Sequence, residues 1–225
     1  MSRDAASGAL LIAGGIAAVV VMGFHPTAHA LMNEETFAHT ALVNMVVHGL
    51  AIAAAPVLFL GLLGVSRRIG HPDLAIAGLV AFGFGTVAVL DAALASGFVF
   101  TGVLRRIAAE EGADPQAFLI YTTLWNQAFA KVHLVAHAIG TTLLSAAVLG
   151  KRTRLPHAAA LGVAGIVVSA AILLLFFSGH VRLDVHGARL IWFFQAGWLA
   201  WLGAAMCSRR GRGDEAHGPR PPLSS

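Results

Sequence analysis

Residues 131–149 read KVHLVAHAIGTTLLSAAVL, a stretch with no charged residue after Lys131 and with histidines at positions 133 and 137. An α-helix rises about 1.5 Å per residue, so residues 118–150, which include this stretch, are enough to cross a bilayer core of about 30 Å. Hydrocarbon accommodates an apolar helix readily and a buried imidazole poorly. The stretch therefore predicts a membrane span, and its histidines mark where a functional site would lie.

Five further apolar runs accompany this one. The chain is 57% hydrophobic and 12% charged, and its mean hydropathy of +0.77 does not describe a soluble domain. We predict an all-α fold, a polytopic transmembrane helical bundle of six spans that forms one domain over residues 1–207. The spans are expected at residues 8–24, 37–64, 74–100, 118–150, 158–179 and 188–207.

Basic residues are distributed unevenly between the two sides of such a bundle. With six spans, the side that holds both termini receives ten of them: Arg3, Arg67, Arg68, Lys151, Arg152, Arg154, Arg209, Arg210, Arg212 and Arg220. The other side receives four: Arg105, Arg106, Arg182 and Arg189. This bias predicts a multi-pass protein of a bacterial-type inner (plasma) membrane with both termini in the cytoplasm. Topology thus explains the sequence pI of about 10.2, and no nucleic acid is expected as a partner.

Three shorter segments carry predictions of their own. Ala28-His29-Ala30 matches a signal-peptidase site, so removal of residues 1–30, which would leave five spans, stays open as an alternative. Residues 101–116 are charged and amphipathic, and we expect a short interfacial helix there on the outer face. Residues 208–225 are rich in arginine, glycine and proline and are expected to form a disordered cytoplasmic tail.

Ionisable residues of several spans fall at one depth of the expected bundle. His48 lies about 25 Å along its helix from the basic end, and Asp91 and His133 lie at nearly the same depth when counted in the same way. His137 lies one helical turn, about 6 Å, deeper than His133. Small residues share a helix face with His48 and another with Asp91, and such faces mark helix contacts in membranes, so both side chains are expected to point inward. The sequence predicts a His/Asp layer in the outer third of the bilayer, with His25 near its outer boundary.

One interpretation of this layer is a haem site. In it, His48 and either His133 or His137 are the axial ligands of a b-type haem, and the protein carries electrons, for example from quinol. The arginines Arg182 and Arg189 would neutralise the haem propionates at the outer surface. The matched depth of His48 and His133 favours this form.

A second interpretation is a haem-free metal centre. Here a transition metal (zinc, copper or iron) is bound by His48, Asp91, His133 and His137. Three such ligands plus water would leave one coordination position open for metal-assisted chemistry. The HxxxH spacing and the acidic residue favour this form.

Functions without a cofactor also stay open. The layer could be a structural hydrogen-bond network between helices, the lining of a transporter or proton path, or part of an accessory subunit for a membrane partner. Against transport, Pro56 is the only mid-span proline, whereas transporters usually interrupt their spans near the midplane. No Walker loop, Rossmann fingerprint, GxSxG or HExxH motif is present, so the sequence leaves enzymatic activity undecided. The lipid bilayer is the partner that composition itself predicts.

Overall fold

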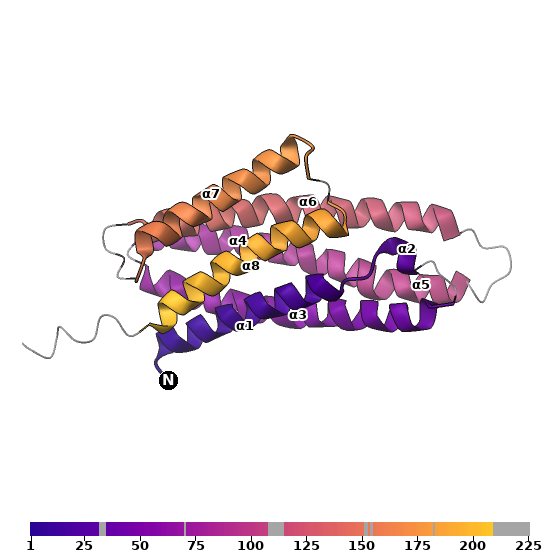
Figure 1. The fold of residues 1–225 in the computed structure, drawn as a ribbon, viewed down its shortest axis with the longest axis horizontal. Coiled ribbons are helices and arrows are strands. Elements are labelled where there is room, and N and C mark those ends of the chain that lie inside the picture. The colour runs from indigo at the N-terminus through magenta and orange to yellow at the C-terminus, as the bar shows by residue number, and fades with distance from the viewer. Residues whose placement is uncertain are drawn as a thin grey trace, which may run out of the picture.

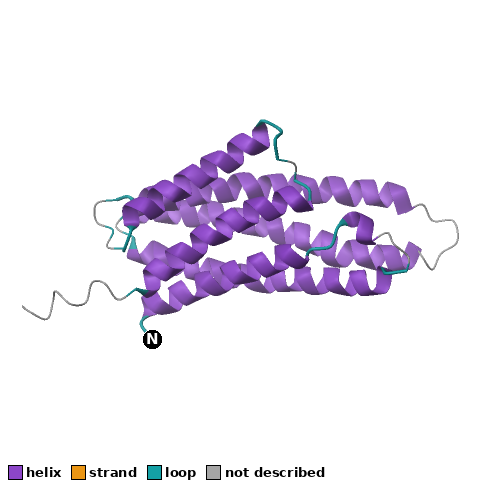
Figure 2. Ribbon diagram, in the orientation of Figure 1, coloured by secondary structure: helices purple, strands orange, loops and turns teal. Residues whose placement is uncertain are grey.

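The computed structural model describes residues 1–31, 35–69, 71–107, 115–150, 153, 155–181 and 183–208. Within these ranges the chain forms helices joined by loops (Figure 1, Figure 2). In chain order they are α1 (Arg3–Phe24), α2 (Ala28–Leu31), α3 (Phe37–Arg68), α4 (Pro72–Leu94), the π-helix η1 (Ala95–Val99), α5 (Phe100–Ile107), α6 (Pro115–Val148), α7 (Ala158–Phe177) and α8 (Val185–Cys207). The predictions for Arg182, for the basic residues 151, 152 and 154, and for the tail from 209 onward lie outside the described residues.

Six stretches of helix are long and apolar enough to cross a membrane: α1, α3, α6, α7, α8 and the continuous run Pro72–Ile107. The predicted all-α bundle of six spans is therefore confirmed. Helix starts follow the local sequence, since Pro72 occupies the first turn of α4, where a missing N–H costs nothing. At the start of α8, the Asp184 carboxylate accepts a hydrogen bond from Gly187 N at 2.8 Å. Which end of the bundle faces the cytoplasm stays a prediction.

The spanning helices contact one another in the ring order α1, α3, α4, α6, α7, α8 and back to α1, with the α7–α8 contact the least extensive. Both termini of the helical region lie at one end of the bundle, which we call the termini end (Figure 1). The opposite end is the one toward which α7 ends, α8 begins and α2 lies, and we call it the distal end (Figure 1). The helices α3, α5 and α6 extend further toward the distal end than α1, α7 and α8 (Figure 1).

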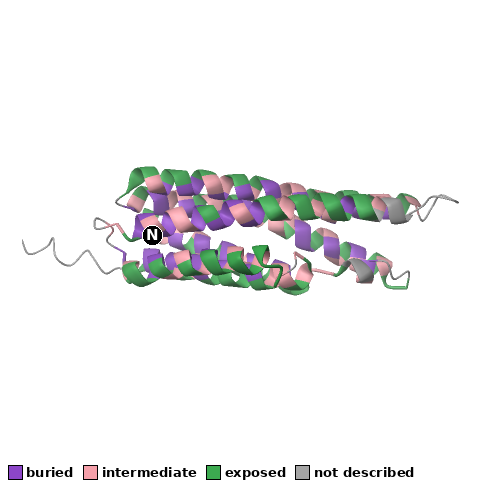
Figure 3. Ribbon diagram, turned by 90° about the horizontal axis from the view of Figure 1, so that it is seen from above, coloured by how far each residue is buried: buried purple, intermediate pink, exposed green. Residues whose placement is uncertain are grey.

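Apolar packing fills the half of the ring toward the termini end. Its buried cluster includes Leu11, Leu62, Leu144, Leu161 and Leu202, each no more than 1% exposed. Buried residues gather on the inward faces of the helices there (Figure 3). Because lipid is as apolar as leucine, close van der Waals contact rather than exclusion of water holds such helices together.

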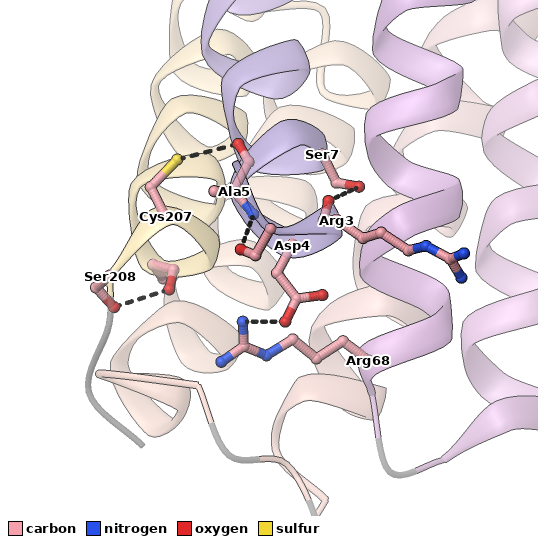
Figure 4. A network of polar contacts seen from close by, with 9 residues as sticks. Arg3, Asp4, Ala5, Ser7, Arg68, Cys207 and Ser208 are labelled. Atoms are coloured by element: carbon pink, nitrogen blue, oxygen red, sulfur yellow. Dashed lines mark hydrogen bonds and ion pairs between the residues drawn. The ribbon is translucent and has the colours of Figure 1, made fainter. Parts of the chain in front are cut away.

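Polar contacts at the termini end join α1 to its two neighbours in the ring (Figure 4). The Asp4 carboxylate pairs with the Arg68 guanidinium at 2.9 Å, which links α1 to α3. The Cys207 thiol donates to the Ala5 carbonyl at 3.6 Å, which links α8 to α1. An ion pair this accessible contributes at most about 1 kcal/mol, so these contacts set register more than stability.

The third span continues into residues 101–116, which the sequence predicted to form an interfacial helix. The structure has α5 following η1 directly and ending at Ile107. The segment is amphipathic as expected, because Thr101 and Leu104 are buried while Arg105 and Arg106 are exposed. Its position at the membrane surface stays a prediction, and residues 108–114 lie outside the described residues.

Glycines at the α4–α6 contact provide a test of the packing. A Cβ added at Gly140 would lie 2.8 Å from Phe82 N and 2.9 Å from the Gly78 carbonyl oxygen, both backbone atoms that cannot move aside alone. We expect Gly140→Ala to destabilise the protein by about 1–3 kcal/mol, as overpacking does, and to lower its melting temperature in detergent. The control is Gly197→Ala, because a Cβ at Gly197 meets nothing within 4 Å. Equal melting temperatures for the two variants would contradict this packing.

Candidate functional site

A cavity of about 460 Å³ lies in the distal half of the ring. It is lined by residues of α1, α3, α4, α6 and α8, together with residues of α2, η1 and α5. A volume of this size lies in the range of about 300–1,000 Å³ that is typical of small-molecule and cofactor sites. Apolar side chains such as Leu58 and Phe82 line it together with polar ones such as Asn126 and Asp184, which suits a mostly apolar ligand that carries a polar group.

Five histidines line this cavity: His25, His48, His133, His137 and His186. They come from the end of α1 and from α3, α6 and α8, so four helices bring them together. His48, His133 and His137 are almost completely buried, with 5%, 5% and 2% of their surfaces exposed, whereas His186 is exposed. The structure thus gathers the three histidines that the sequence predicted for the site, and adds His25, which the sequence placed only at the membrane boundary, and His186 at the start of α8.

His48 and His133 are oriented by the same device. The Nδ1 atom of His48 lies 2.8 Å from the Asn44 carbonyl oxygen, and that of His133 lies 3.0 Å from the Gly85 carbonyl oxygen. A carbonyl can only accept, so each Nδ1 carries the proton and each Nε2 of the neutral ring keeps its lone pair. The Nε2 of His133 is buried and has no hydrogen-bond partner among the described residues.

His137, one turn beyond His133 on α6, carries its proton on the other ring nitrogen, Nε2. Its ring stacks on Phe82 with centroids 3.8 Å apart, and its Nε2 lies 3.4 Å from the Thr86 hydroxyl. That hydroxyl donates to the Phe82 carbonyl at 2.9 Å, so it accepts from His137, which leaves Nδ1 as the lone-pair nitrogen. This Nδ1 is also buried without a partner among the described residues.

The remaining rings enclose this pair of histidines. The His133 ring lies 3.9 Å from that of His137, centroid to centroid, and stacks on Trp192 of α8 at 4.8 Å. The His25 ring, at the end of α1, lies against the His48 ring of α3 in a T-shaped arrangement with the ring centroids 4.8 Å apart. Aromatic contacts on several sides therefore hold the imidazole planes in place.

His25, like His48, carries its proton on Nδ1. Its Nδ1 donates to the Pro26 carbonyl at 2.8 Å, so its Nε2 keeps the lone pair. Burial lowers the pKa of His25 below its ordinary value of 6.5; the hydrogen bond to Pro26 opposes this effect and the positive charge of Arg189 adds to it. His25 is consequently neutral at pH 7.

Arg189 has a structural partner that the sequence did not reveal. Its Nε donates to the Met22 carbonyl at 2.7 Å, and one terminal nitrogen donates to the His25 carbonyl at 3.0 Å. These are carbonyls at the end of α1, which have no partner within the helix. Arg189 is not part of the cavity wall, so the propionate contact proposed for it stays a prediction.

Asp91 does not share the cavity with the histidines. The wall formed by α4 includes Val89, Ala92 and Ala93, and at about 100° per residue Asp91 points roughly 200° away from Val89. It is half-buried on another face of α4. Among the residues that the structure describes, no group of three or more His, Cys, Asp or Glu side chains is placed to hold one metal ion. The four-residue metal set therefore stays a prediction, without support from the placement of Asp91.

Comparison of the chain with protein-family models, with curated proteins and with solved structures finds no match. Function is therefore argued from the site itself. In that site, four histidine rings each donate their N–H to a protein acceptor and keep one nitrogen lone pair: His25, His48, His133 and His137. Lone pairs without donors suit a Lewis acid such as a metal ion, because histidine ligands typically donate their other N–H to a backbone carbonyl.

The role of Arg189 can be tested by removing its charge. Arg189→Met removes donors from the end of α1, and hydrogen bonds from a charged group contribute about 1.5–3 kcal/mol. We expect a lower melting temperature than wild type, with partial recovery in Arg189→Lys. The control is Arg105→Met, at an exposed position of the distal end. If Arg189→Met has the same melting temperature as the wild type, Arg189 does not stabilise the end of α1.

Proposed function

We propose that the protein binds a b-type haem in the histidine cavity, with His48 and His133 as axial ligands, and carries electrons in the membrane. One observation carries this proposal: two nearly buried histidines from α3 and α6 line one cavity, and each is held with its Nδ1–H on a backbone carbonyl, which makes Nε2 the lone-pair nitrogen of the neutral ring. This tautomer is the one that an axial histidine requires.

The residues around the cavity fit such a group. The orphaned Nε2 of His133 lacks the partner that a buried polar atom normally has, and an iron would supply it. Bound haem supplies reversible one-electron chemistry. Apolar side chains such as Leu58 and Phe82 line the cavity together with Asn126 and Gln127, whose side-chain amides could donate hydrogen bonds to propionates.

The geometry favours haem over a mononuclear metal centre. A b-type haem needs two axial histidines and a largely apolar cavity, and His48 and His133 both line one such cavity. A zinc, copper or iron site needs three or more protein ligands, and the described residues provide no such cluster. We accordingly rank the haem-free centre second among the cofactor hypotheses.

Electron exchange would take place within or beside the bilayer. Large apolar side chains such as Val80, Phe84, Leu174 and Phe177 are exposed on the helices, as lipid contact requires. A quinol dissolved in the lipid, or a membrane partner subunit, is the class of electron donor that this location admits.

One observation favours a second candidate, a proton path along α6. Thr141 and Ser145 continue the spacing of His133 and His137 toward the termini end, and they are 2% and 0% exposed. Gln195 of α8 donates to the Thr141 hydroxyl at 3.3 Å. Such a path would show as proton uptake by proteoliposomes loaded with a pH-sensitive dye, which haem binding alone does not require.

The axial pair is tested by removing each imidazole in turn. We expect His48→Ala and His133→Ala each to abolish haem retention after purification, because one histidine alone leaves the iron with a vacant position. His39→Ala is the matched control, since His39 lies on α3 with His48 but is exposed. Haem per chain is measured by absorbance, and folding by circular dichroism. Full haem content in folded His48→Ala and His133→Ala would reject the ligand assignment.

A further inference from the structure

A π-helix lies against His48. The segment Ala95–Val99 interrupts the third span with π-helical turns, which are rare and occur often at functional sites. A Cβ added at Gly97 would clash with the Cβ of His48 and lie 2.7 Å from its Cγ. Only glycine lets the two helices approach this closely, so the backbone of η1 forms one wall of the space that holds the His48 side chain.

Asn44 holds η1 in this position. It is 1% exposed, and its Nδ2 donates to the Ser96 carbonyl at 2.9 Å and to the Thr101 hydroxyl at 3.1 Å. The Thr101 hydroxyl in turn donates to the Gly97 carbonyl at 2.9 Å. A π-helix changes the regular hydrogen-bond register, and in a membrane its backbone groups must find partners inside the protein. Both amide protons of Asn44 serve that need.

Asn44 also acts directly on His48. Its backbone carbonyl, one turn earlier on α3, accepts the Nδ1–H of His48 at 2.8 Å. One residue therefore joins the π-helix to the imidazole: its side chain binds η1 and its carbonyl fixes the tautomer. The His25 ring also contacts the His48 ring in a T-shaped arrangement with centroids 4.8 Å apart, which is an aromatic contact and not a hydrogen bond.

We propose that Asn44 and Gly97 are positioning residues that seat His48, setting the direction of its Nε2 toward the ligand. This inference rests on the proposed haem function, because it names the residues that would determine how one axial imidazole meets the iron. The π-helix is the structural part of the seat, since it brings Gly97 against His48 while leaving Ser96 and Thr101 within reach of Asn44. Loss of either residue should change the orientation of His48 without changing that of His133.

The first test compares two glycines of the third span. Gly97→Ala adds a methyl group against His48, whereas Gly102→Ala adds one where nothing lies within 4 Å. We expect Gly97→Ala to weaken haem retention about 10–100-fold, the usual effect of disturbing the support of a ligand. The residual haem should show an altered low-spin ferric EPR signal, which reports the relative orientation of the axial rings. Gly102→Ala should match the wild type in both measurements. Identical EPR signals and retention in the two variants would overturn the inference.

The second test uses Asn44→Leu, which keeps the approximate size of the side chain and removes both donors to η1. We expect a shifted midpoint potential and an altered EPR signal in a protein that folds as judged by circular dichroism. If Asn44→Leu does not fold, the comparison of Gly97→Ala with Gly102→Ala tests the inference in its place. An unchanged potential and EPR signal in folded Asn44→Leu would overturn the role of Asn44 while leaving the haem proposal standing.

A third measurement separates this inference from the proposed function. Histidine-selective ¹⁵N NMR of haem-free protein reports the tautomer and hydrogen bonding of each ring. If wild type never takes up haem, the proposed function fails, and these shifts then decide the seating of His48 alone. A change at His48 but not at His133 in Gly97→Ala supports the seat, and unchanged shifts at both overturn it.

Discussion

Hydrocarbon offers no hydrogen-bond partner, so each imidazole within this bundle must give its N–H to the protein itself. His48 and His133 use backbone carbonyls of α3 and α4, and His137 uses the Thr86 hydroxyl. Each ring is thereby left with one lone-pair nitrogen, and the three residues line one cavity. The tautomers follow from satisfying these few polar groups, while the stacking of Trp192 and Phe82 fixes the planes of the rings.

The two halves of the bundle have different roles: the half toward the termini end contributes packing, and the distal half contains the cavity. Toward the termini end, leucines close the ring and glycines such as Gly140 allow α4 and α6 to touch. Toward the distal end the same helices line the cavity, and Arg189 and Asn44 add directed hydrogen bonds to the apolar packing. A closely packed apolar half thus adjoins a half that can hold a ligand, as a preorganised site requires.

Hydropathy and helical spacing predicted much of this arrangement. Apolar length alone identified the six spans, and counting along the helices placed His48 and His133 at one depth with His137 one turn deeper, and the structure finds all three lining one cavity. Periodicity says which residues share a face but not what that face meets, so Asp91 was expected inward although α4 turns it away from the cavity. The bond from Arg189 to Met22 joins residues 167 apart in sequence, and no local pattern signals it. The π-helix was also missed, because its signal is a shift of one residue in the pairing of the backbone.

The most direct test of the account is an optical spectrum of the detergent-purified wild-type protein, air-oxidised and then reduced with dithionite, with elemental analysis of the same sample. The account predicts a Soret band that sharpens and moves to the red on reduction, together with about one iron per chain. Protein that is folded but has neither a Soret band nor iron, even after incubation with haem, would contradict the central claim that the histidine cavity is a haem site.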